Sequence, residues 1–175
     1  PDSFPKYLDI NFPAISTVPD GGVTTVAFAD GSFGVAFWEE EGNEGFYQPV
    51  SDSFELLPLV QFDGAINVQL CVSPVSDLAL MVYATGLGEV AGRFIYHEDG
   101  DTVGEPFDIP NEITTQSTNA TCAGLPDGSF VVTVSDCDGS YDCDTTLQLL
   151  DSEEGVSEFG VELHTDDDGE QLPFS

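Results

Sequence analysis

Four cysteines and a cluster of aspartates are the residues of this 175-residue chain whose types and spacing could do chemistry. Cys137 and Cys143 flank a turn in the stretch DCDGSYDCD, a spacing that suits a disulfide across a hairpin. Cys71 and Cys122 form the other available pair, and an even, fully pairable set favours an oxidising compartment. A zinc site made from these cysteines and a histidine is the alternative. The sequence lacks the paired short Cys-x-x-Cys spacing typical of such sites, so we predict two disulfides.

The same stretch offers carboxylates to a hard cation. Four aspartates surround Gly139 within nine residues: Asp136, Asp138, Asp142 and Asp144. Calcium takes several oxygen ligands at about 2.4 Å, which aspartates clustered around a glycine turn can supply. The stretch lacks the closing glutamate of an EF-hand loop, and acidic turns are common in a chain this acidic. Calcium is therefore the one cofactor that the sequence suggests, against the alternative of a solvated acidic surface.

The charge excludes several classes of partner. Thirty-three acidic residues against two basic ones give a formal net charge of −31. Nucleic acids and anionic membrane surfaces are bound by clustered Lys and Arg, which this chain does not have. No apolar run is long enough to predict insertion into a membrane. Glycans remain a candidate partner through Trp38 and the nearby Phe37, Phe46 and Tyr47, although core and cross-strand packing is the commoner role of such residues.

Catalytic motifs are missing from the sequence. There is no Gly-x-Ser-x-Gly elbow and no phosphate-binding glycine loop. Carboxylates are so abundant that no pair stands out as a glycosidase acid and base. We therefore predict that the protein is not an enzyme, with a polysaccharide hydrolase as the least favoured hypothesis.

A repeated phrase indicates the architecture that positions these residues. ADGSFGVAFW at 29–38 returns as PDGSFVVTVS at 126–135, and a blurred copy, SDLALMVYAT, occupies 76–85. Short apolar runs bounded by seven Asp-Gly dipeptides predict β-strands and tight turns. We expect one all-β domain of three units of about fifty residues and four antiparallel strands each, at about 18–64, 65–113 and 114–175. Cys71 and Cys122 occupy equivalent places in consecutive units, so neighbouring first strands could bring them together.

These units resemble a known family. The pattern L-x-D-G-S-F-x-V, followed by an acidic glycine turn and a strand ending like GEPFDIP, resembles the propeller-type repeats of secreted bacterial surface proteins. The resemblance implies four-stranded, blade-like units on an extracellular protein and no particular catalytic residue. Propellers close with typically about four to eight blades, so three units leave either a barrel-like closure or an incomplete propeller with open edges.

The N-terminal arm, residues 1–17, contains one strand too many. YLDINFPAIST at 7–17 matches PFDIPNEITTQ at 106–116, the last-strand sequence of the second unit, although no unit precedes it. The surplus strand either folds back into its own sheet or completes the sheet of another copy, as in donor-strand complementation. Its predicted polymerisation residues are Tyr7, Leu8, Ile10 and Phe12.

The leading hypothesis is therefore a structural subunit of a secreted bacterial surface assembly, a fibre or pilus-like homopolymer built by N-terminal strand exchange. The alternative is an extracellular calcium- or carbohydrate-binding module of an adhesin. Secretion is also expected because the chain begins at Pro1 without an apolar leader, as a processed chain would. The triplet Asn119-Ala120-Thr121 is a candidate glycosylation site.

Overall fold

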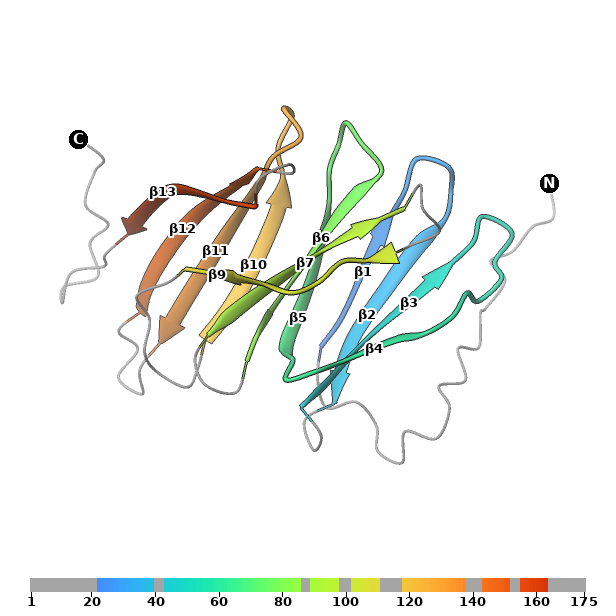
Figure 1. The fold of residues 1–175 in the computed structure, drawn as a ribbon, viewed down its shortest axis with the longest axis horizontal. Helices are drawn as coiled ribbons and strands as arrows, with labels where there is room; N and C mark the ends of the chain where they lie inside the picture. The colour runs from blue at the N-terminus through green and yellow to red at the C-terminus, as the bar shows by residue number, and fades with distance from the viewer. Residues whose placement is uncertain are drawn as a thin grey trace.

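The computed structural model contains β-strands and no helix in the residues that it describes (Figure 1). These are residues 22–39, 43–85, 89–97, 102–110, 118–137, 143–151 and 155–163. For 155–163 and for positions 118, 136, 137, 143 and 144 only the backbone is described. The predicted all-β fold is confirmed. The N-terminal arm, with the predicted strand Tyr7–Phe12, lies outside the described residues.

Three antiparallel sheets follow one another along the chain. In the first, the strands lie in chain order: β1 (Val23–Ala27), β2 (Phe33–Glu39), β3 (Glu44–Val50) and β4 (Val60–Asp63). In the second sheet, β5 (Ile66–Val72), β6 (Leu78–Ala84) and β7 (Val90–Tyr96) follow in chain order. The short strands β8 (Thr102–Val103) and β9 (Phe107–Ile109) both pair with β7. The third is again in chain order: β10 (Thr118–Gly124), β11 (Phe130–Cys137), β12 (Cys143–Asp151) and β13 (Gly155–Leu163).

The repeated sequence phrase forms the same turn in the first and third sheets. In both copies, at residues 30–32 and 127–129, the glycine has a positive φ, of 94° and 95°. The aspartate Oδ1 accepts a hydrogen bond from the backbone nitrogen of the serine two residues later, at 2.9 and 3.0 Å. It also accepts one from the serine hydroxyl, at 2.6 Å in each turn. Only glycine adopts this φ at little cost, and a short acidic side chain closes the turn on its own backbone.

The sheets pack face to face in a row, with β5 between β1 and β10 (Figure 1). One hydrophobic cluster joins the first sheet to the second, with Tyr47, Met81 and Ile95 among its fully buried members. A second cluster joins the second sheet to the third and includes Leu80 and Phe130. Alternation of side chains along each strand allows β6 to contribute to both clusters, one from each face.

The row is open in the part of the chain that the structure describes. Among the described strands, none pairs with a strand of another sheet, so the sheets do not close into a barrel. Neither hydrophobic cluster joins the first sheet to the third. Barrel-like closure, one of the two architectures that the sequence left open, is therefore not found. None of the described residues forms a helix that could cross a membrane.

Candidate functional site

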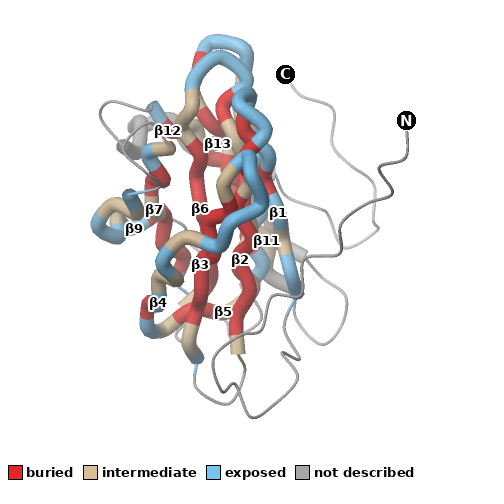
Figure 2. The backbone as a smooth tube through the Cα atoms, turned by 90° about the vertical axis from the view of Figure 1, so that its right-hand side faces the viewer, coloured by how far each residue is buried: buried red, intermediate tan, exposed pale blue. Residues whose placement is uncertain are grey.

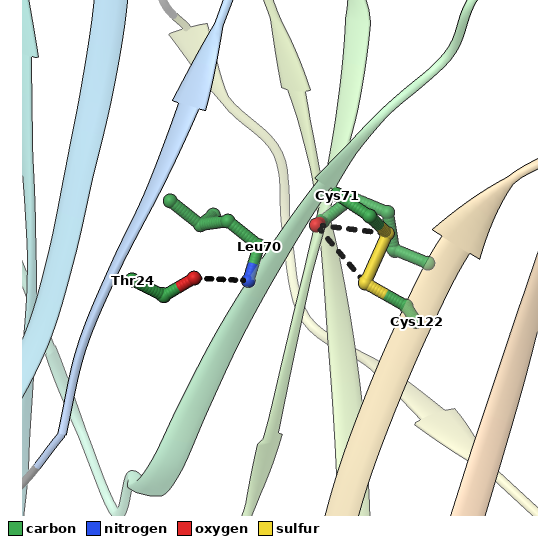
Figure 3. Close-up of a disulfide and its surroundings, with 5 residues drawn as sticks. Thr24, Leu70, Cys71 and Cys122 are labelled. Carbon is green, nitrogen blue, oxygen red and sulfur yellow. Dashed lines mark hydrogen bonds between the residues drawn. A yellow bond between two sulfur atoms is a disulfide. The ribbon is translucent and has the colours of Figure 1, made fainter.

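The contacts between neighbouring sheets contain a disulfide and a polar cluster. At the junction of the second and third sheets, Cys71 in β5 and Cys122 in β10 form a disulfide with a Cα–Cα distance of 5.8 Å (Figure 3). This predicted pair is confirmed, and it removes both sulfurs from any zinc site because zinc binds thiolates. The Leu80 carbonyl oxygen lies 3.6 and 3.8 Å from the two sulfurs. Disulfide sulfur carries no hydrogen, so these are packing contacts.

β5 is also fixed to its neighbours by its backbone. On one side, Thr24 Oγ1 of β1 accepts a hydrogen bond from the Leu70 nitrogen at 3.3 Å (Figure 3). On the other side, Gly124 of β10 approaches β5 so closely that a Cβ atom there would collide with the Val72 carbonyl group. The absence of a side chain at Gly124 thus permits the spacing that the disulfide bridges.

A polar cluster joins the first sheet to the second. His97, directly after β7, stacks its ring on Phe28 with centroids 4.1 Å apart and an interplanar angle of 6°. Its Nε2 lies 2.9 Å from Ser32 Oγ and 3.0 Å from Asp30 Oδ2, and its backbone nitrogen donates to the Asp77 carbonyl at 3.1 Å. The Asp-Gly-Ser turn of the first sheet is therefore held by a histidine of the second.

These contacts change the acidity of the turn. The pKa of Asp30 lies well below its ordinary value, first because the Ser32 hydroxyl donates to the carboxylate and then because His97 and the Ser32 backbone do. The pKa of Asp127 is also lowered, by the hydroxyl and backbone of Ser129. The two copies of the turn differ in that a histidine contacts Asp30.

Aspartate, serine and histidine in contact raise the question of nucleophilic catalysis. In a catalytic triad the histidine nitrogen accepts the serine proton, while the other ring nitrogen binds the carboxylate. Here Ser32 donates its proton to Asp30, and both residues contact the same nitrogen, Nε2, which therefore donates. The arrangement orients a turn and does not activate Ser32.

A cleft of about 520 Å³ opens beside this cluster, between the end of β1 and the turn that joins β5 to β6. Its walls are residues 27–29 and 72–77, most of them small or apolar. Val75 projects there with 61% of its surface exposed.

Sequence reasoning missed the junction of the first and second sheets because Asp30 and His97 are 67 residues apart, and only the packing of the two sheets brings them together.

The predicted calcium residues and the second disulfide lie at one end of the third sheet. The β11–β12 register places Asp136 opposite Asp144 and Cys137 opposite Cys143. Residues 138–142, which include Asp138 and Asp142, lie outside the described part of the chain. Among the residues that the structure describes, no group of three or more potential metal ligands occurs. Calcium binding and the Cys137–Cys143 disulfide therefore stay predictions.

The candidate glycosylation residue Asn119 is exposed on β10. Its side-chain oxygen accepts a hydrogen bond from Asn67 Nδ2 at 2.9 Å, which links β10 to β5 a second time. The side chain is accessible, and glycosylation of its nitrogen remains a prediction.

The aromatic residues suggested for glycan stacking are buried. Phe37, Trp38, Phe46 and Tyr47 are 1%, 9%, 5% and 0% exposed. Trp38 and Tyr47 belong to the cluster between the first and second sheets, whereas Phe37 and Phe46 stack on each other at 5.0 Å. Core and cross-strand packing, the alternative given with the glycan hypothesis, is what the structure shows for these four residues.

Comparison with known proteins identifies no family. No family model matches the sequence, and no curated protein does either. Among solved structures, the hydrazine synthase of Kuenenia stuttgartiensis is similar with a TM-score of 0.48 and 12% sequence identity. The match covers 78% of this chain and 49% of that protein, so this chain spans about half of its length. A likeness this weak carries no argument about function.

Proposed function

We propose that this protein is a structural subunit of a secreted bacterial surface assembly, in which copies join through the N-terminal strand Tyr7–Phe12. The observation that supports the proposal is the open row of sheets. The first and third sheets each have an outer face, turned away from the second sheet, that no other described sheet covers. A row with two open ends can be extended at either end, and an association that does not close on itself builds a filament.

The arrangement within the row supports a blade-like interpretation. Each sheet places its first strand, β1, β5 or β10, next to the first strand of a neighbouring sheet. That is the arrangement expected for three blades of an incomplete propeller, and propellers need typically about four or more blades to close.

The Cys71–Cys122 disulfide supports secretion and a mechanical role. Such bonds persist in oxidising compartments, and this one joins the second and third sheets covalently. A force applied along a fibre would therefore meet a covalent link at this junction instead of packing alone.

Size in solution tests the proposal. Light scattering after size exclusion should show polymers that grow as salt rises from about 0.1 M to about 1 M, because salt screens the repulsion between highly negative subunits. Deletion of residues 1–13 should leave monomers. A variant with the same thirteen residues in scrambled order is the matched control, since it preserves length and charge. A full-length protein that stays monomeric throughout this salt range would overturn the proposal.

A further inference from the structure

The outer face of the first sheet is buried along its two central strands. On β2 and β3, the side chains of Val35, Phe37, Phe46 and Gln48 are 7%, 1%, 5% and 5% exposed. They point away from the second sheet, because the alternate residues Ala36, Trp38 and Tyr47 belong to the cluster between the sheets. Figure 2 views the molecule from this side and shows β2 and β3 buried. We refer to these four residues as the β2–β3 strip.

The strip is narrow. One register row crosses the sheet from Val23 through Phe37 and Phe46 to Gln61. Val23 is 62% exposed and Gln61 is exposed, whereas the two phenylalanines between them are almost completely buried. A second sheet packed on this face would cover all four strands. Burial of the central two alone fits a single extended segment.

Central position in a sheet does not by itself produce this burial. On the outer face of the third sheet, Val131 of β11 and Leu147 and Leu149 of β12 occupy equivalent central positions and are only half-buried. The outer face of the first sheet is therefore covered more completely than the outer face of the third.

The loop between β3 and β4 accounts for one end of the cover. Gln48 Nε2 donates to the Leu57 carbonyl at 2.6 Å, and Phe54 meets the ring of Phe33 edge-on at 6.0 Å. The other end of the strip is the stacked pair Phe37 and Phe46. The next register row beyond that pair is acidic: Glu39, Glu44 and Asp63.

We propose that the N-terminal segment, residues 4–12, covers the β2–β3 strip. In an extended segment Phe4, Lys6, Leu8, Ile10 and Phe12 share one side. The segment can run from the acidic row toward the row of Phe33. In that direction, Leu8 over the row of Phe37 and Phe46 places Lys6 over the acidic row, because adjacent rows on one face of a strand are two residues apart. Lys6 is the only lysine of the chain.

Charge and chain length both favour this segment. The C-terminal residues 164–175 contain four acids and no Lys or Arg, so the acidic row would repel them. The nine residues 13–21 reach about 30 Å when extended, at roughly 3.3 Å each. Phe12 would lie over the row of Phe33, and Val23 lies in the row of Phe37, four residues along the strand. Residues 13–21 therefore have to span about 14 Å at that rise. The segment can therefore cover the strip of its own chain.

This inference does not depend on fibre formation. A segment that covers the strip in its own chain can cover the same strip in a neighbouring copy, as in domain swapping. Strand exchange in the proposed function would then use this surface as its acceptor.

Photo-crosslinking of the full-length chain tests the docking surface. A benzophenone amino acid in place of Leu8 should crosslink to residues 35–37 or 46–48, as mapped by mass spectrometry. Crosslinks to the third sheet or to residues 164–175 would overturn the proposal. The mass of the crosslinked species separates the two proposals: a monomer mass with the predicted contacts supports this docking and contradicts exchange, whereas a dimer mass supports both.

Charge reversal tests the pairing of Lys6 with the acidic row. Lys6→Glu should lower the crosslinking yield severalfold, and the added change Glu44→Lys should restore it. The matched control adds Asp108→Lys instead, which restores the same net charge at an exposed position of the second sheet. Equal recovery by both changes would show that only net charge matters and would refute the pairing.

Discussion

Removal of the Cys71–Cys122 disulfide should destabilise the protein and detach its third sheet first. The two cysteines are 51 residues apart in the sequence. In the chain-entropy model a crosslink closing a loop of this length stabilises the folded state by about 4 kcal/mol at 25 °C, and measured values are often lower. The double substitution Cys71→Ala and Cys122→Ala avoids leaving a single reactive thiol. We expect it to lose roughly 2–4 kcal/mol of unfolding free energy.

Urea unfolding followed by circular dichroism measures this loss. With a slope of about 2 kcal/mol per molar urea, the midpoint should fall by roughly 1–2 M. Hydrogen exchange should show where the loss occurs. Amides of β10 and β11 should exchange faster in the double variant, whereas those of β2 and β3 should change little, because the first sheet packs on the second through a separate cluster.

The matched control removes the other predicted disulfide. Cys137→Ala with Cys143→Ala opens a loop closed over only six residues, for which the same model gives roughly 2 kcal/mol. That change also leaves the junction of the second and third sheets intact. An unchanged urea midpoint in the Cys71 and Cys122 variant, or free thiols at these positions in the natural protein, would refute the reasoning.

Three further outcomes are expected. Gly124→Ala should cost about 1–3 kcal/mol in urea unfolding, because its Cβ would meet the rigid Val72 carbonyl, whereas Gly22→Ala, in open space, should cost far less. Asp30→Asn should lower the melting temperature at pH 7 more than Asp127→Asn does, since Asp30 is the aspartate of the two that His97 contacts. A carboxyl group whose pKa is lower in the folded state stabilises that state at pH values above its unfolded pKa. The difference between the two variants should therefore disappear as the pH falls below about 4 and through the folded pKa. If the acidic loop binds calcium, chelation should lower the melting temperature, and Asp138→Asn should abolish that sensitivity; equal melting with and without chelator would leave only a solvated surface.

The sequence determined the features that depend on neighbours along the chain. The Asp-Gly-Ser turns at 30–32 and 127–129 are specified within three residues, by a glycine that adopts a positive φ and an aspartate that accepts hydrogen bonds from the serine two residues later. Short apolar runs bounded by Asp-Gly turns were likewise sufficient to predict antiparallel strands. The Cys71–Cys122 pair was predictable because both residues hold equivalent positions in consecutive units, and equivalent first strands lie side by side.

Only the tertiary structure decided which faces meet. The contact of His97 with Asp30 joins two sheets, and so does the contact of Gly124 with Val72. No local sequence pattern specifies either contact. The burial of Phe37 on the outer face could not be read from the strand either, because alternation assigns a side chain to a face and not to a partner. Turns and strands follow from interactions across a few residues, whereas sheet packing depends on the summed shape and charge of whole faces far apart in the chain.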